Sequence, residues 1–77
     1  MKTYHLAVTL PDGNKVMARA RASSLQDEVS IEWSGAVDRL GELAVGKYEV
    51  GFLCWYLEGR ARQLGGEFTF HEENSSK

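Results

Sequence analysis

Polar and apolar residues alternate along two segments, residues 3–10 and 15–22, and a strong turn sequence joins them. A period of two is typical of a β-strand with one buried face. The connecting residues 11–14 read PDGN, in which proline presets its own φ and glycine and asparagine tolerate positive φ. The sequence therefore predicts a β-hairpin that supplies one face of the core.

The two faces of this hairpin differ in character. The inward face consists of Tyr4, Leu6, Val8, Leu10, Val16, Ala18, Ala20 and Ala22. The alanines leave room for a bulky element to pack closely. The outward face carries the basic residues Lys15, Arg19 and Arg21, together with His5, Thr9 and Met17.

Residues 24–44 are compatible with either a helix or a strand. A helical period places seven apolar residues on one stripe: Leu25, Val29, Trp33, Ala36, Val37, Leu40 and Ala44. Gly35 and Gly41 oppose a helix, since each costs about 1 kcal/mol relative to alanine in a helix interior. We expect a helix here; the alternative, a strand over residues 28–33, would move the fold toward a small barrel.

The rest of the chain predicts one more helix and one more strand. Residues 47–64 are helical in pattern and end at Gly65-Gly66, which suits a left-handed C-cap. Residues 67–72 alternate, with Phe68 and Phe70 inward. The expected fold is α+β with the order ββααβ: a three-stranded, mainly antiparallel sheet with two helices packed on one face. Residues 1–72 would form a single compact domain, and residues 73–77 a flexible polar tail.

Composition places the chain among small globular domains. Its 77 residues include 43% hydrophobic and 26% charged residues, which is near the globular average. One cysteine, Cys54, and the lack of a charged and then apolar leader lead us to expect a cytoplasmic setting. The longest apolar run, residues 52–57, is far shorter than the ~20 residues of a membrane helix.

Residues 41–48 read GELAVGKY, close to the phosphate-binding pattern G-x-x-x-x-G-K-[ST]. Tyr48 occupies the position where a hydroxyl would bind magnesium, and the preceding residues favour a helix over a strand. We therefore interpret this stretch as a connector between the two helices, with Gly46 ending the first and Lys47 opening the second. No nucleotide or other cofactor is expected.

Catalytic and metal-binding residues are also not expected. Cys54 lies in the middle of the second helix on its core face, where a thiol is buried and poorly reactive. His5 and His71 would share the outer sheet face, on neighbouring strands if the last strand pairs with the first. Two imidazoles are too few ligands for a structural zinc site.

Two charged surfaces are candidates for binding. The basic outward face, with Lys15, Arg19 and Arg21, is the alternative nucleic-acid site, although the aromatic residues of these strands point inward and would not stack on bases. The other surface is an acidic ridge on the first helix, which either is simply solvated or attracts a basic partner. Its residues are Asp27, Glu28, Asp38 and Glu42.

The second helix has apolar residues on both of its faces. Val50, Leu53, Cys54, Leu57, Ala61 and Leu64 supply a complete core face. Tyr48, Phe52, Trp55 and Tyr56 fall on the opposite side, with Arg62 nearby. Either Trp33 and Leu40 of the first helix cover these aromatic residues, or they form an exposed partner-binding patch.

In size, net charge of −2 and lack of catalytic motifs, the chain is similar to small inhibitor proteins of phages and mobile elements, of which anti-CRISPR proteins are one class. That resemblance implies a non-enzymatic domain that blocks a surface of a larger complex. The partner would be another protein or a protein–nucleic acid complex, and a homodimer is a second form of the same expectation.

Overall fold

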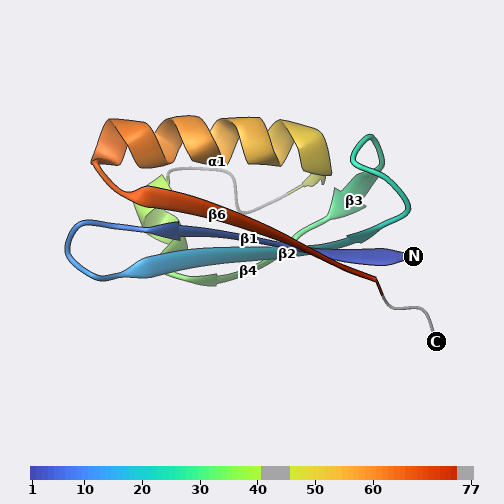
Figure 1. Cartoon of the computed structure of the whole chain (residues 1–77), viewed down its shortest axis with the longest axis horizontal. Helices are drawn as coiled ribbons and strands as arrows, with labels where there is room; N and C mark the ends of the chain where they lie inside the picture. Colours follow the sequence, from blue (N-terminus) through green and yellow to red (C-terminus); the bar gives the residue numbers. More distant parts are fainter. Residues whose placement is uncertain (41–45, 75–77) are drawn as a thin grey trace.

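The computed structural model describes residues 1–40 and 46–74, and it places one α-helix against one face of a four-stranded antiparallel sheet (Figure 1). The elements are β1 (Lys2–Thr9), β2 (Lys15–Ala22), β3 (Glu28–Ser30), β4 (Glu32–Gly35), the 3-10 helix η1 (Val37–Leu40), β5 (Lys47–Glu49), α1 (Val50–Leu64) and β6 (Glu67–Asn74). The main sheet has the order β4-β2-β1-β6, and β3 and β5 form a separate two-stranded sheet. The α+β class is therefore confirmed, with a different element count.

The predicted hairpin is confirmed as β1 and β2. Residue Tyr4 lies opposite Ala20, and the register continues without a break along both strands. At the turn, the Gly13 amide donates to the Leu10 carbonyl at 2.9 Å, and Gly13 has a φ of 93°. All eight residues predicted to face inward are buried.

The turn residue Asp12 gives a first prediction. Asp12 accepts a hydrogen bond from the Asn14 amide at 3.0 Å and another from Arg39 Nη1 at 2.9 Å. The Asn14 bond, followed by the Arg39 bond, lowers the pKa of Asp12 below its ordinary value of 3.8. A lowered pKa means that the ionised carboxylate stabilises the fold above pH 3.8, and that this contribution is lost as the pH falls through the folded pKa.

Replacing Arg39 with alanine should raise the pKa of Asp12 without restoring it fully, because the Asn14 bond remains. An NMR titration of the Asp12 carboxyl carbon measures this directly. An unchanged pKa in the variant would show that Arg39 does not hold the turn in solution.

The helix predicted over residues 24–44 is wrong. The structure places β3, β4 and η1 in the described part of this segment, so the strand alternative is the correct one. The segment forms a strand because the edge of β2 that does not face β1 offers backbone hydrogen bonds to β4. The small side chain of Ala18 also leaves room for Trp33, which lies opposite it. Gly35 then turns the chain with a φ of 85°, and the Ala36 amide donates to the Lys15 carbonyl at 2.9 Å. No barrel forms from the described strands, since β3 pairs with β5 in a sheet of its own.

The second predicted helix is confirmed as α1, although it begins at Val50 instead of Lys47. Residues 47–49 pair with β3 as β5, which delays the helix by three residues. Its end is as expected: Gly65 adopts a left-handed conformation with a φ of 77°, and the Gly66 amide donates to the Ala61 carbonyl at 2.8 Å. The buried residues of α1 are Val50, Leu53, Leu57 and Ala61, which pack over the inward face of the hairpin.

The last strand is longer than predicted. Strand β6 pairs with β1 and extends to Asn74, so Glu73 lies in the strand and not in a tail; residues 75–77 lie outside the described part of the chain. Phe68 packs against the core, while Phe70 faces the same side and stays 41% exposed at the sheet edge. In the described ranges, no helix is both long and apolar enough to cross a membrane.

Candidate functional site

Four aromatic side chains form a cluster in which Phe52 and Trp55 of α1 are exposed, while Tyr48 of β5 and Tyr56 of α1 pack against the core. We call Tyr48, Phe52, Trp55 and Tyr56 the aromatic patch. The Phe52 ring is its centre: its centroid lies 6.2 Å from that of Tyr48, 6.0 Å from that of Trp55 and 6.1 Å from that of Tyr56. These spacings are those of interacting aromatic pairs. The patch is therefore a packed cluster and not a set of scattered rings.

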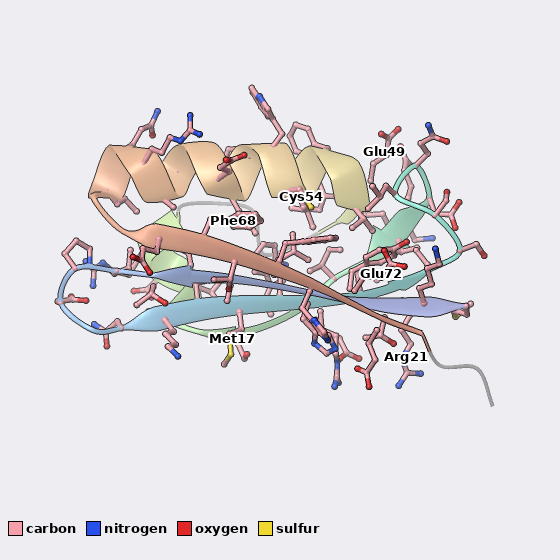
Figure 2. All side chains as sticks on the ribbon, in the orientation of Figure 1. Met17, Arg21, Glu49, Cys54, Phe68 and Glu72 are labelled. Atoms are coloured by element: carbon pink, nitrogen blue, oxygen red, sulfur yellow. The ribbon has the colours of Figure 1, made fainter. Side chains whose placement is uncertain are left out.

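The aromatic patch is open to solvent at its middle. Trp55 is 71% exposed and Phe52 is 42% exposed, whereas Tyr48 and Tyr56 are partly buried against the core. Side chains project from α1 away from the sheet with no second layer above them in the described part of the chain (Figure 2). The helix that was expected to bring Trp33 over this face does not form, and Trp33 packs against the core from β4 instead.

A shallow groove of about 270 Å³ continues from Trp55 toward the C-terminal end of α1. Its lining residues are Trp55, Tyr56, Glu58, Gly59, Arg60, Arg62 and Gln63. Gly59 leaves a gap in this lining, since it has no side chain and a Cβ placed there would face open space. A glycine inside a helix destabilises it by about 1 kcal/mol relative to alanine, so Gly59 lowers the stability of α1.

Arginine side chains border the groove. Arg62 Nη2 donates to Glu58 Oε2 at 3.2 Å, the i,i+4 pairing that favours a helix, and its side chain is 79% exposed. Arg60 Nη1 donates to Gln63 Oε1 at 2.8 Å. In the part of the chain that the structure describes, the buried Nε of Arg60 has no hydrogen-bond partner. The groove thus combines an exposed indole with guanidinium groups, the residue types in which binding hot spots are enriched.

The predicted acidic ridge does not lie on a single helix. Asp27 closes a loop, since its Oδ2 accepts from the Ser23 amide at 2.7 Å. Glu28 lies in β3 opposite Glu49, and Asp38 lies in η1. Glu42 is outside the described residues. A steering role for these residues stays a prediction, but the continuous helical surface on which it was based is absent.

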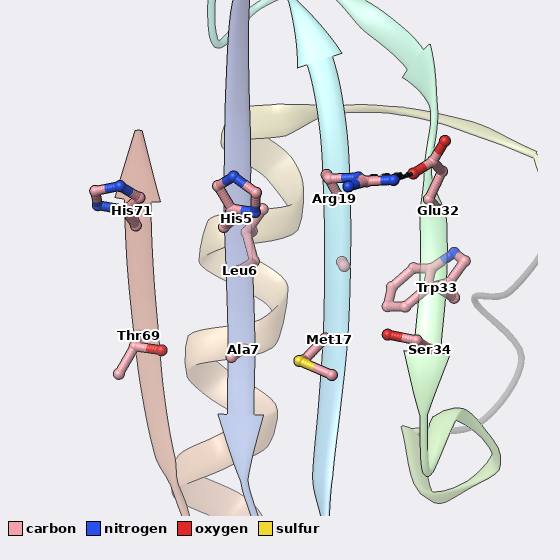
Figure 3. A pocket seen from close by; sticks show the side chains of 11 residues that line it. His5, Leu6, Ala7, Met17, Arg19, Glu32, Trp33, Ser34, Thr69 and His71 are labelled. Carbon is pink, nitrogen blue, oxygen red and sulfur yellow. Dashed lines mark hydrogen bonds and ion pairs between the residues drawn. The ribbon is translucent and has the colours of Figure 1, made fainter. Parts of the chain in front are cut away.

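The other candidate surface is the outer face of the sheet, opposite α1, where Figure 2 shows Met17 and Arg21. One row crosses all four strands in register: His71, His5, Arg19 and Glu32 (Figure 3). As expected, the two histidines lie on neighbouring strands, with ring centroids 5.9 Å apart. A hollow of about 460 Å³ lies over this row and the next one.

Two residues of this outer face, Arg19 and His5, lie beside carboxylates. Arg19 Nε donates to Glu32 Oε1 at 2.7 Å, and His5 Nε2 lies 3.0 Å from Glu73 Oε1. Glu32 was missed as a neighbour of Arg19 because it was assigned to a helix. The ion pair with Glu32 weakens the attraction of Arg19 for phosphates, while Trp33 and the two histidines line the hollow. A role for Lys15, Arg19 and Arg21 in such binding stays a prediction.

Cys54, the single cysteine, is partly buried in α1. Burial, together with the nearby Glu58 carboxylate, raises the pKa of the Cys54 thiol, so the reactive thiolate is disfavoured at neutral pH. Within residues 1–40 and 46–74, no group of three or more His, Cys, Asp or Glu side chains is placed to hold a metal ion.

Most of the GELAVGKY stretch lies outside the described residues. Of its last residues, Gly46 has a φ of 101° and Lys47 opens β5, so the interpretation of Lys47 as the first residue of a helix is wrong.

Comparisons of the chain with protein-family models, with curated proteins and with solved structures gave no match.

Proposed function

We propose that this protein is a non-enzymatic binding module that attaches to another protein through the aromatic patch. The observation that carries the proposal is the 71% exposure of Trp55, which contacts the central Phe52 ring of a packed aromatic cluster. Large aromatic side chains are rarely left in water without a function, and a contiguous apolar patch on a small domain usually marks an interaction site.

The surroundings of Trp55 support the same function. The missing side chain at Gly59 leaves space for a partner side chain to approach the helix backbone. The Arg62 side chain can exchange Glu58 for a carboxylate on the partner. Inhibition of a larger protein or protein–nucleic acid complex is the specific form that we propose, by analogy with the small inhibitors described above. Such a protein acts by occupying a surface and needs no reactive group.

Replacing Trp55 with alanine tests this function. We expect affinity for the partner to fall by about 30-fold or more, since hot-spot residues contribute 2 kcal/mol or more to binding. The free energy of unfolding should change by less than about 0.5 kcal/mol, as is usual for exposed positions. The partner would first be captured from extracts of the native host on the immobilised protein, and its affinity for both variants then measured by calorimetry.

The matched control is Met17→Ala, which removes an exposed apolar side chain from the opposite face of the molecule. Its affinity should equal that of the unmodified protein. If Met17→Ala weakens binding while Trp55→Ala does not, the partner uses the outer sheet face and the proposed function is wrong. Retained binding by Trp55→Ala, combined with loss in an Arg19→Ala, Arg21→Ala double variant and a steep salt dependence, would instead indicate a nucleic-acid ligand.

A further inference from the structure

One long edge of the main sheet is unpaired in the described part of the chain. Strand β6 pairs with β1 on one side, and the structure gives it no strand partner on the other. An edge strand presents a row of free N–H and C=O groups, which makes it a template for another strand. The opposite edge, β4, is only four residues long, whereas β6 has eight. Strand β6 contains neither lysine nor proline, which commonly protect such edges, and its charged residues are Glu67, Glu72 and Glu73.

We propose that β6 pairs antiparallel with β6 of a second copy of this chain, about a two-fold axis at Thr69. This register places Phe68 opposite Phe70 of the second copy, both on the α1 side of the sheet. Directly opposite side chains of this kind stabilise a strand pair. Phe70 is 41% exposed, and its ring stacks on the Tyr4 ring with centroids 5.8 Å apart. Pairing would bury the remaining exposed surface of Phe70.

Hydrogen-bonding complementarity on the outer face supports the same register. Glu67 comes to lie opposite His71 of the second copy, and the two-fold axis repeats this pair. Both residues are exposed, so the pair forms without moving the core. A register shifted by one pair along the strand, centred on Phe70, would place Glu67 against Glu73 and Phe68 against Glu72. The charges therefore favour the register centred on Thr69.

A hollow beside α1 provides space for the second copy. It has a volume of about 270 Å³ and lies between the flank of α1 and the start of β6. Its lining residues are Glu58, Ala61, Arg62, Gly66, Glu67 and Phe68. In the proposed register residues 67–71 of the two copies pair, and Glu72 of the second copy lies beside Gly66, the residue that precedes β6.

A cysteine at the two-fold axis tests the register. Directly opposite residues in an antiparallel pair have Cα atoms about 4.5–5.5 Å apart, which is within disulfide range. In a Cys54→Ala background, Thr69→Cys should therefore form a covalent dimer when the two thiols are oxidised with diamide. The matched control is Glu67→Cys on the same strand and face, because its two copies would lie about 13 Å apart, at 3.3 Å per residue.

Charge reversal is the second test, read by analytical ultracentrifugation. The unmodified protein should sediment with twice the 8.6 kDa mass of one chain at high concentration. His71→Glu should raise the dimer dissociation constant about tenfold, because it creates two repulsive pairs across the axis. Adding Glu67→Lys to that variant should restore association.

Different experimental results would contradict the β6 pairing and the proposed function. Trp55→Ala should leave the dimer intact, because the aromatic patch lies away from the β6 edge. The edge proposal is wrong if the protein sediments as a single chain and Thr69→Cys cross-links no faster than Glu67→Cys. A dimer that Trp55→Ala dissociates and His71→Glu does not would also overturn it, since the aromatic patch would then be the dimer interface.

Discussion

Replacing Leu53 with alanine should lower the free energy of unfolding by about 3 kcal/mol. Leu53 lies on the inner face of α1 and is 0% exposed. Buried leucine-to-alanine changes cost about 2–5 kcal/mol, because they lose apolar burial and leave a cavity. At ~0.05–0.15 kcal/mol per residue, a chain of this size has only about 4–12 kcal/mol of stability in total. The variant should therefore be partly unfolded at moderate temperature.

Urea denaturation followed by far-ultraviolet circular dichroism measures this loss. The control is Leu25→Ala, which makes the same chemical change at a residue that is 44% exposed. Its cost should be well under that of Leu53→Ala. Equal losses for the two variants would mean that α1 does not pack on the sheet through Leu53.

Replacing Gly35 with alanine should have an effect of similar size for a different reason. A Cβ at this position would lie 2.2 Å from the Lys15 carbonyl oxygen, and the φ of 85° is itself unfavourable for alanine. The neighbour is backbone, so it cannot rotate away. We expect a loss of more than about 2 kcal/mol, concentrated where β4 meets β2.

Gly59→Ala is the matched control, because its Cβ would enter open space on an exposed part of α1. This substitution should raise the free energy of unfolding by about 0.5–1 kcal/mol. If the structure is right, denaturation should show a lower free energy of unfolding for Gly35→Ala and a higher one for Gly59→Ala. Hydrogen exchange should in addition show faster exchange in β4 for Gly35→Ala. A Gly35→Ala protein as stable as the original would place β4 elsewhere.

The sequence predicts the hairpin, α1 and β6 well because each has a local signal. Alternation together with PDGN defines the hairpin, and Gly65 marks the end of α1. Residues 24–40 carry two signals at once, since Val29 and Trp33 fit both a helical stripe and a strand. The free edge of β2 decides between them, and that edge is a property of the assembled sheet that no local window contains.

The sequence predicted the positions of Phe52 and Trp55 on α1, whereas their exposure could not be predicted. The helical period places Phe52 and Trp55 opposite the core, and the structure has them there. Whether they are exposed depends on whether another element covers them. The sequence predicted a first helix that could have covered them, and that helix does not form. The outer-face neighbours of Arg19 were missed for the same reason, because Glu32 joins the sheet only when its segment is a strand.

The corner between α1 and β6 affects the entropy of binding. Only Gly65 and Gly66 separate these elements, and a Cβ at Gly66 would lie 2.2 Å from the Thr9 carbonyl oxygen. The residues that follow α1 therefore pack closely against the end of β1. In the proposed complex the partner would bind an aromatic patch whose helix is already fixed to the sheet. Little backbone entropy would therefore be lost when the complex forms.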